Sequence, residues 1–394
     1  MNTEILNTEA QDFITSNLYA DVSILLLKGL YFKHIETKEI IEQIEAKKRS
    51  EKKLPSWFNT PKIYYPNKLN IEQTSSEITA KYKANLILGK SIIDLTGGFG
   101  VDCYYFSKRF KRVTYCEINP ILAKIATHNF KSLHVNNIDS HPVDGITYLK
   151  NTNTSFDWIY IDPSRRHDSK GKVFFLKDCL PDVPQHIDIL FKHTKNILIK
   201  TSPLLDLSVG IGELKHVKTI HVIAVNNEVK ELLWVLEKEF NSTISIKTVN
   251  IKDGTPELFS FYLEEEKHTE APYHLPLGFL YEPNSAILKT GAFHLVAKQY
   301  NIFKLHQHSH LYTSKDLIGF SGRIFKIENV IPFNKKAIKK QGITKANITT
   351  RNFPETVSQI RKKFSIKDGG DTYLFFTTDM DNNKIMLVCT KIKT

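Results

Sequence analysis

The chain has 394 residues, of which 41% are hydrophobic and 24% are charged, and its formal net charge is +12. This length can form two or three domain cores, and the composition is that of an ordinary globular protein. Apolar runs fall far short of the roughly 20 residues of a membrane span, and the N-terminus has no basic leader, so we expect a cytoplasmic protein without a membrane partner.

Charge and cysteine usage narrow the class of partner. From Ser321 to the C-terminus, 15 Lys or Arg stand against 6 Asp or Glu. A basic segment on a near-neutral body indicates a polyanionic partner, most often nucleic acid, although a solvated basic surface is the alternative. The four cysteines form no C-x-x-C pair, which argues against a disulfide framework and a zinc knuckle. We expect reduced, buried thiols.

The first 70 residues are expected to be mainly helical. Apolar residues recur at helical spacing over residues 1–50. Prolines then punctuate residues 55–66, which predicts an extended segment. Residues 71–83 have the pattern of a capped helix with Thr74 or Ser75 as N-cap. These hydroxyls can face a ligand or simply cap the helix.

The most informative stretch is residues 92–102, Ile-Ile-Asp-Leu-Thr-Gly-Gly-Phe-Gly-Val-Asp. An apolar strand, a glycine turn and a helix start are typical of a nucleotide-binding α/β sheet. Gly98 and Gly100 have no Cβ, so the backbone can approach a ligand, and Asp94 can accept from a ligand ammonium. A dinucleotide site has a third glycine where this chain has Cys103. The acid-first order instead resembles motif I of class I S-adenosylmethionine (SAM) methyltransferases.

Strands and helices alternate beyond this turn. With the strand before the turn, seven strands are expected, the later six at residues 113–117, 141–143, 158–161, 197–199, 217–225 and 260–263. Helices are expected at residues 101–109 and 120–130 and after Gly145. Such alternation predicts a doubly wound, mostly parallel sheet.

Two acids follow the second and third strands. Glu117 stands about 20 residues past the glycine turn, where an acid can hold both ribose hydroxyls. Its neighbours Ile118, Asn119 and Pro120 match the acid-x-Asn-Pro text common in SAM enzymes, although the spacing also fits a nicotinamide site. Asp144 is placed either to contact an adenine amino group or to cap the next helix.

The fourth strand separates these ligand classes, because it ends in Asp162-Pro163-Ser164-Arg165-Arg166. A dehydrogenase has no need of Asp-Pro here, whereas in a methyltransferase the rigid turn aims carbonyls and the acid at the nucleophile. Methylation of an amine or ring nitrogen needs mainly alignment and desolvation. Amino-group enzymes commonly carry Pro-aromatic after Asp-Pro, and Ser164-Arg165 replaces it here. The two arginines can stack on a base, hold a phosphate or form structural ion pairs.

Covalent carbon methylation and metal chemistry are disfavoured. The first requires a cysteine near the Asp-Pro turn or after the fifth strand, and residues 200–203 have none, while Cys179 is expected in a helix. His306, His308 and His310 would share one face of a strand, where they can bind zinc. Because no partnering acid or thiolate is visible, no metal is expected.

A new composition begins near Glu266, where prolines mark a boundary. A small module and a final α/β module follow, the latter with a strand, a helix, an extended segment, a second helix and a hairpin at residues 323–327, 335–340, 347–350, 353–364 and 373–390. Aromatic residues alternate with the basic ones here, which suits phosphates and unstacked bases, although most of these rings are expected in the core.

Several motifs together resemble one family, and they lie at residues 72–77, 94–102, 162–166, 200–203, 351–354 and 368–371. The family is the bacterial class I SAM-dependent methyltransferases with a ferredoxin-like module and a THUMP-like C-terminal domain. The resemblance implies a Rossmann-like α/β methyltransferase domain at 71–265, after a helical region at 1–70. It also implies a ferredoxin-like module at 266–320 and a THUMP-like RNA-binding domain at 321–394. THUMP domains present structured RNA to a catalytic domain, so an rRNA or tRNA substrate is implied.

The leading hypothesis is therefore a SAM-dependent RNA methyltransferase acting on a base nitrogen. SAM is assigned to Asp94, Thr96, Gly97, Gly98, Phe99, Gly100, Asp102, Glu117, Ile118, Asn119 and Asp144. The catalytic corner is assigned to Asp162, Pro163, Ser164 and Arg165, and RNA binding to Arg166, Lys335, Lys336, Arg351, Lys362 and Lys363. The alternatives are a non-catalytic SAM-binding RNA-binding or assembly protein, and a small-molecule or protein methyltransferase.

Overall fold

The computed structural model describes residues 1–29, 32–165 and 175–393. The chain forms two compact units. The first contains Met1–Val217 and Trp234–Phe240, and the second contains Lys218–Leu233 and Asn241–Thr394. No helix among the described residues combines the length and the apolar character that crossing a membrane requires.

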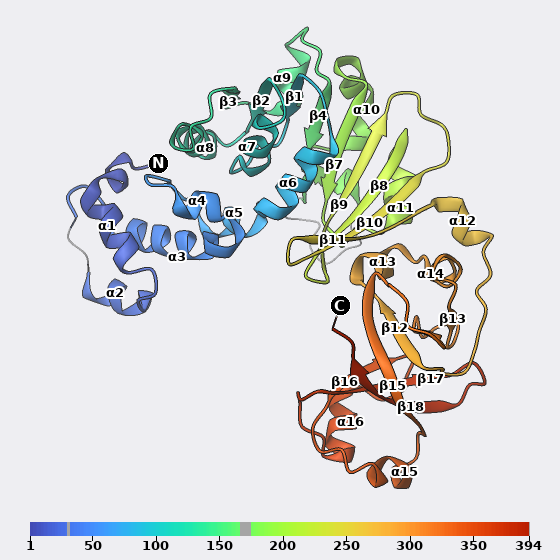
Figure 1. Ribbon diagram of the computed structural model, residues 1–394. Helices are drawn as coiled ribbons and strands as arrows, with labels where there is room; N and C mark the ends of the chain where they lie inside the picture. The colour runs from blue at the N-terminus through green and yellow to red at the C-terminus, as the bar shows by residue number, and fades with distance from the viewer. Residues whose placement is uncertain (30–31, 166–174, 394) are drawn as a thin grey trace. The chain divides into compact units, whose positions relative to one another are not determined.

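Helices form most of the N-terminal region, as predicted (Figure 1). After a 3-10 turn at Thr3–Leu6 they are α1 (Thr8–Ser16), α2 (Val22–Lys28), α3 (Thr37–Lys53), α4 (Pro55–Asn59), α5 (Lys68–Gln73) and α6 (Glu77–Leu86). The predicted extended segment is wrong at its start, because Pro55 begins α4. The predicted single helix over 71–83 is also wrong: α5 ends at Gln73, and Ser76 rather than Thr74 or Ser75 caps α6.

A nine-stranded sheet follows, in the order β11-β10-β8-β9-β7-β4-β1-β2-β3. Its strands are β1 (Ser91–Asp94), β2 (Arg112–Cys116), β3 (Ile138–His141), β4 (Trp158–Ile161), β7 (Asn196–Thr201), β8 (Val217–Val225), β9 (Glu228–Glu237), β10 (Ser245–Lys252) and β11 (Thr255–Tyr262). The β1–β2, β2–β3, β1–β4, β4–β7 and β8–β10 pairs are parallel, and β10–β11 is antiparallel. The doubly wound, mostly parallel sheet is confirmed, with β9 and β10 added to the seven predicted strands.

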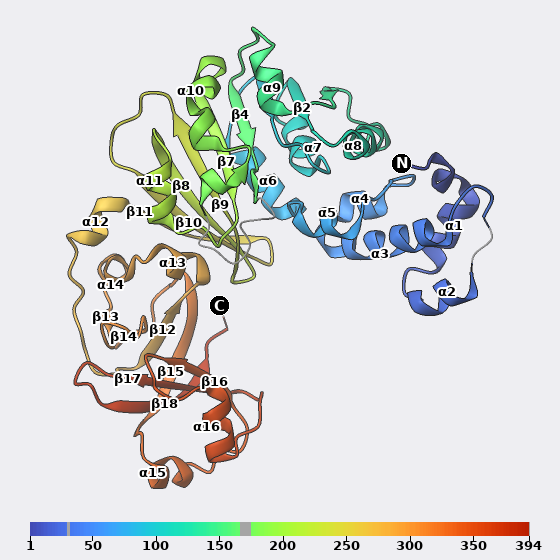
Figure 2. The ribbon, with the colours of Figure 1, turned by 180° about the vertical axis from the view of Figure 1, so that it is seen from behind.

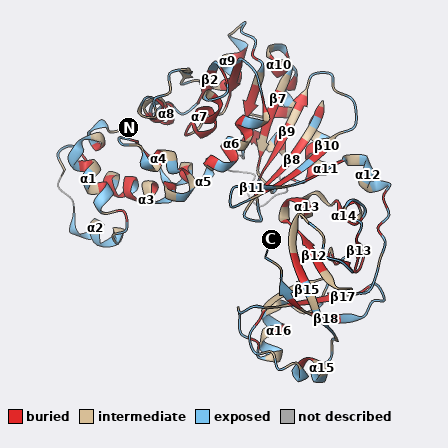
Figure 3. Ribbon diagram, viewed as in Figure 1, coloured by how far each residue is buried: buried red, intermediate tan, exposed pale blue. Residues whose placement is uncertain are grey.

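Helices connect the strands of this sheet (Figure 2). They are α7 (Val101–Ser107), α8 (Pro120–Ser132), α9 (Gly145–Lys150), α10 (Val183–His193) and α11 (Leu207–Glu213). All four residues of β1 are buried, as are most residues of β4 and β7 (Figure 3). Strands covered on both faces read as continuous apolar runs, which is why these three were found from the sequence.

A short antiparallel pair follows the Asp-Pro corner. It joins β5 (Ser164–Arg165) to β6 (Cys179–Leu180), and a 3-10 turn at Leu176–Asp178 precedes β6. The prediction that Cys179 lies in a helix is therefore wrong. The residue pairs with Arg165 across the ladder, and its buried Sγ donates to the carbonyl of Phe175 at 3.5 Å.

In the second unit a seven-stranded sheet has the order β13-β14-β12-β15-β18-β17-β16. Its strands are β12 (Phe279–Pro283), β13 (Phe303–Lys304), β14 (Tyr312–Ser314), β15 (Gly322–Pro332), β16 (Asn347–Arg351), β17 (Thr372–Thr378) and β18 (Lys384–Lys391). The helices are α12 (Leu263–Lys267), α13 (Ser285–Thr290), α14 (Phe293–Tyr300), α15 (Lys335–Lys340) and α16 (Val357–Phe364). The β17–β18 hairpin is confirmed, whereas α16 begins four residues later than predicted because Thr356 forms its capping box.

Candidate functional site at the ends of β1, β2, β4 and β7

The glycine turn joins β1 to α7 and allows close backbone packing. The amide of Gly97 donates to the carbonyl of Cys116 at 2.8 Å, and a Cβ on Gly97 would overlap the ring of Tyr115. Gly100 has a φ of +82°, and a Cβ there would lie 2.5 Å from the ring of Phe130. Both positions therefore require glycine.

Glu117 lies directly after β2 and faces this turn. Its Oε2 accepts from the amide of Gly98 at 2.8 Å, and its Oε1 accepts from the amide of Asn119 at 2.8 Å. Each carboxylate oxygen has a further lone pair, so the held carboxylate can still accept from two vicinal hydroxyls. Asn119 itself caps α8, and the side chain of Ile118 is exposed.

Asp94 holds the turn from inside, with only 1% of the residue exposed. Its Oδ1 accepts from the amide of Thr96 at 2.9 Å, and its Oδ2 accepts from Cys103 Sγ at 3.3 Å. Burial raises the pKa of Asp94 to about 7, and the nearby carboxylates of Asp102 and Asp162 add to this rise. A carboxyl that titrates near neutrality therefore lies under the turn, and its predicted contact with a ligand ammonium stays a prediction.

Replacing Asp94 by Asn is expected to flatten the pH dependence of stability between about pH 4 and pH 7. The pKa of Asp94 rises from 3.8 to about 7 on folding, so in this window the folded state holds a proton that the unfolded state has lost. The free energy of unfolding therefore falls as pH rises through the window, by up to about 1.4 kcal/mol per pH unit. Asn keeps the amide contact but has no proton to lose.

Urea unfolding followed by tryptophan fluorescence measures this effect, because all three tryptophans, Trp57, Trp158 and Trp234, lie in the first unit. The wild type and the Asp94→Asn variant share every other titrating group, so the difference between their pH profiles isolates this carboxyl. Parallel profiles for the two proteins would contradict the prediction.

The Asp-Pro corner meets the glycine turn directly. The amide of Asp162 donates to Oγ1 of Thr96 at 2.7 Å, and β4 lies beside β1. The carboxylate of Asp162 forms an ion pair with Lys200 on β7. Pro163 is buried and Ser164 is exposed. The corner is therefore fixed by residues from two neighbouring strands.

The structure does not describe the side chains of Arg165 and Arg166, which the sequence assigned to this corner and to RNA. Arg165 belongs to β5, which begins directly after Pro163. Arg166 lies outside the described residues. Their predicted contacts with a base or a phosphate stay predictions.

Asp144 follows β3 and caps α9, since its Oδ1 accepts from the amide of Thr147 at 2.8 Å. This confirms the capping interpretation, and the adenine contact stays a prediction for the other oxygen. A Cβ on the next residue, Gly145, would overlap the backbone of Leu95. The start of α9 therefore packs tightly against the residue before Thr96.

The two remaining residues of the predicted cofactor set point into the core. The Phe99 ring packs near Trp57 of α4, with ring centroids 6.1 Å apart. Asp102 accepts from Tyr160 and from Ser75, both at 2.8 Å, and its carboxylate lies 3.2 Å from the ammonium of Lys83. This buried network joins α6, α7 and β4 beneath the turn.

Three residues of the site received no role from the sequence: Tyr115, Gly145 and Lys200. Tyr115 packs on Gly97 and donates to the carbonyl of Gly98 at 2.6 Å. For Lys200 a signal existed, because it stands at the end of an apolar strand in the text Lys-Thr-Ser-Pro.

Apart from Arg166, the basic residues assigned to RNA lie in the second unit. Lys335 and Lys336 begin α15, and Lys362 and Lys363 lie in the last turn of α16, which packs against α15. Lys363 pairs with Glu355 at 2.6 Å. Among the described residues no ion pair is found for Lys335, Lys336 or Lys362.

Arg351 stands apart from these lysines, at the end of β16. Its guanidinium lies 2.8 Å from the buried carboxylate of Glu282, which also pairs with Arg323. Two of its five N–H donors are therefore used within the second unit.

The three alternating histidines lie in the connection between β13 and β14, so the strand on which they would share a face is not formed. His306 contacts Asn382 at 3.2 Å and Asn352 at 3.0 Å, and the ring of His310 stacks on Phe293. Within the described ranges, no group of three or more His, Cys, Asp or Glu side chains is arranged to hold a metal ion.

The parallel sheet, the acid-first glycine turn, the acid after β2 and the Asp-Pro corner after β4 together define a class I methyltransferase fold. A solved structure from Porphyromonas gingivalis W83, described as a "putative methyltransferase", is 33% identical to this chain. The match covers 99% of this chain and 98% of that one, with a TM-score of 0.88. The family described as a ferredoxin-like domain matches residues 279–320, and the one described as THUMP domain-like matches residues 322–391. The chain belongs to the bacterial class I methyltransferase family that carries these two modules.

Two further solved structures match less than half of the chain. An rRNA methylase from Streptococcus thermophilus is 14% identical over 41% of this chain and 94% of its own, with a TM-score of 0.30. TrmK from M. capricolum, in complex with S-adenosyl-homocysteine, is 18% identical over 48% of this chain and 73% of its own, with a TM-score of 0.32. Neither likeness is close enough to carry a functional argument. A comparison with curated proteins finds no match.

Proposed function

We propose that this protein is a SAM-dependent methyltransferase that acts on a base nitrogen of structured RNA, such as rRNA or tRNA. The observation that carries the proposal is the hydrogen bond from the amide of Asp162 to Thr96. This hydrogen bond joins the glycine turn, where the nucleoside part of SAM would bind, to the Asp-Pro corner, where the nucleophile would bind. A methyl donor on one side and an acceptor on the other would then be neighbours.

The residues at the strand ends fit SAM. Glu117 has lone pairs left for two ribose hydroxyls. Glycine at 97 and 100 lets the turn pack closely on the rings of Tyr115 and Phe130, which fixes the backbone beside Glu117. Bound SAM supplies an electrophilic methyl group on a sulfonium. The carboxylate of Glu117 adds negative charge beside the turn, which favours this cation.

Asp162 is assigned to the acceptor. Its carboxylate and backbone carbonyl can accept from the N–H groups of a base amino group, which directs the nitrogen lone pair at the methyl. Lys200 restricts this carboxylate to one orientation through their ion pair. RNA as the substrate is supported by the THUMP-like match at 322–391 and by the excess of basic residues after Ser321.

Replacing Glu117 by Gln is expected to weaken SAM binding about 10- to 100-fold, because a charged acceptor of the ribose hydroxyls is lost. Calorimetric titration with SAM and with S-adenosyl-homocysteine measures it. Glu213 offers a matched control, since its carboxylate also accepts from two backbone amides, those of Leu176 and Lys177. An equal loss in Glu117→Gln and Glu213→Gln would assign the effect to backbone support rather than to the ligand.

Radiolabel transfer from SAM to total RNA tests the reaction, and mass spectrometry of nucleosides from cells with and without the protein finds the modified base. Salt-dependent RNA binding without any transfer would instead support a non-catalytic SAM-binding RNA protein. Transfer to a small molecule or protein, without RNA binding, would overturn the RNA substrate.

A further inference from the structure

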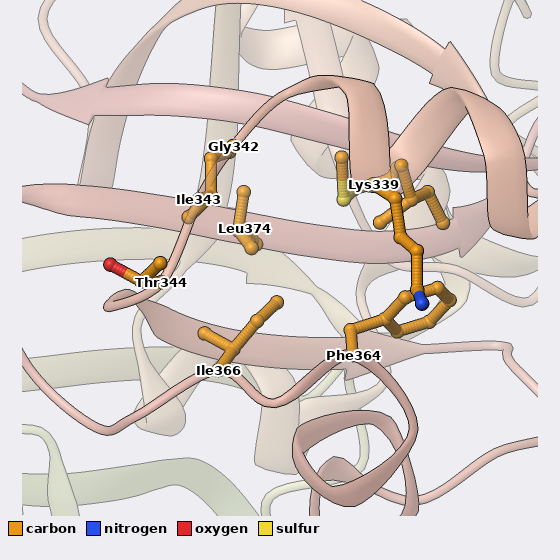
Figure 4. Close-up of a pocket in the computed structure, with 9 residues that line it drawn as sticks. Lys339, Gly342, Ile343, Thr344, Phe364, Ile366 and Leu374 are labelled. Carbon is orange, nitrogen blue, oxygen red and sulfur yellow. The ribbon is translucent and has the colours of Figure 1, made fainter.

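A pocket of about 170 Å³ opens in the THUMP-like domain, between α15, the segment after it and the end of α16. Its lining includes the apolar side chains of Ile343, Phe364, Leu374 and Met386, of which Leu374 and Met386 are fully buried. Two polar side chains complete the lining, Lys339 and Thr344. Figure 4 shows Lys339 beside the ring of Phe364 and Thr344 at the opposite end of the lining.

The size of the pocket limits its occupant to one ring system. Sites for drug-sized ligands and cofactors measure about 300–1,000 Å³. By contrast, an apolar cavity of about 150 Å³ holds a single benzene ring. The pocket is therefore too small for SAM and fits one planar ring, whose faces meet the apolar walls and whose edge meets the hydroxyl and the ammonium.

The charge around the pocket favours a polyanion as the bearer of that ring. Between Lys335 and Asp368 the chain has ten Lys or Arg and two Asp or Glu. Both acids are already paired within the domain, Glu355 with Lys363 and Asp368 with Arg361. For the lysines of α15, at 335, 336, 339 and 340, the described part of the chain shows no ion pair.

We propose that this pocket holds one unstacked nucleobase of a single-stranded RNA segment. The ring of Phe364 and the aliphatic side chains contact the faces of the base, and the lysines of α15 contact the flanking phosphates. This assignment rests on the proposed RNA substrate. It identifies the pocket and α15 as the part of the domain that would bind the RNA. An apolar peptide side chain is the competing occupant.

Nucleotide titration of the full-length chain tests the pocket without RNA. The chain has only three methionines, so methyl-labelled Met386 gives a readily assigned NMR signal from the pocket lining. Uridine 5′-monophosphate, whose base is a single ring, is expected to shift this signal, and ribose 5-phosphate is expected to leave it in place. No shift with either compound, or equal shifts with both, overturns the proposal. A response to indole but not to the nucleotide would assign the pocket to an apolar side chain and would also overturn it.

RNA binding provides the second test. Thr344→Phe places a ring at the exposed end of the pocket, and Ser358→Phe adds the same ring at an exposed position of α16 outside it. Single-stranded oligouridylate is expected to bind about 5- to 100-fold more weakly to Thr344→Phe than to Ser358→Phe. Replacing the bases by abasic sites should remove that difference. Equal affinity of both variants overturns the pocket and leaves the RNA substrate standing. Absence of RNA binding by the wild type overturns the proposed function, and the nucleotide titration still decides the pocket.

Discussion

Replacing Asp162 by Asn is expected to reduce methyl transfer to RNA by about 10²- to 10⁴-fold while SAM affinity stays within about threefold. The carboxylate is fixed by Lys200, and the backbone of the corner is fixed by Thr96, so the acid is held ready to orient an acceptor. Asn retains one acceptor oxygen but loses the charge and the ion pair. Single-turnover transfer from radiolabelled SAM, with calorimetry on the same preparation, separates the two quantities.

Two further variants make this result specific. Lys200→Met removes the cation that pairs with Asp162 and is expected to lower transfer in the same direction, because this ion pair no longer holds the carboxylate in one orientation. Asp188→Asn changes an exposed acid of α10 in the same unit and should leave both activity and binding unchanged. Full transfer by Asp162→Asn would remove the corner from the reaction.

Most of the first sheet follows from local sequence signals. Each of these elements has its own local signal: an apolar run for β1 and for β4, glycines for the turn, and Pro120 for the start of α8. The sequence predicts them within a few residues. The strand β9 was missed because its connection to β8 is only Asn226-Asn227. Both residues have positive φ, as a two-residue hairpin turn requires. In the sequence, however, Asn-Asn indicates such a turn more weakly than Asn-Gly.

Three predictions in other parts of the chain were wrong for local reasons: the histidine strand, the helix at Cys179 and the start of α16. The alternating histidines suit a strand, but His310 adopts a φ of +52°, which ends any extended run. Leu180 directly precedes Pro181 and is therefore biased towards extended backbone, and Cys179 lies beside it in β6. The start of α16 was visible in the sequence, since Thr356-Val-Ser-Gln359 matches a capping box.

The candidate site was predictable where it depends on strand ends and unpredictable where it depends on which strands are neighbours. Thr96 and Asp162 each lie just after an apolar strand, and the carboxyl ends of parallel strands meet at one sheet edge. The pairing of Asp162 with Lys200 requires that β7 lie beside β4, which no local pattern states. Asp102 stands at a helix start, where the sequence does not tell whether an acid faces a ligand or a buried partner. In the structure its carboxylate lies beside the ammonium of Lys83.

Replacing Lys83 by Met is expected to lower the free energy of unfolding of the first unit by about 3–5 kcal/mol. The Lys83 side chain is fully buried, and its ammonium lies 3.2 Å from Asp102, whose side chain is 10% exposed. The substitution keeps the apolar stem but leaves the carboxylate of Asp102 buried without its cation. Hydrogen bonds from Ser75 and Tyr160 remain and offset only part of that cost.

The double variant Lys83→Met/Asp102→Asn identifies the cause. Removing both charges should recover at least half of the lost stability, because Asn still accepts from Ser75 and Tyr160 and no unpaired charge is buried. Lys81→Met, at an exposed position of the same helix, is the matched control and should cost less than about 1 kcal/mol. Since every tryptophan lies in the first unit, fluorescence-detected urea unfolding reports on this network. A double variant no more stable than Lys83→Met would mean that packing of the lysine stem, rather than its charge, holds α6 to α7.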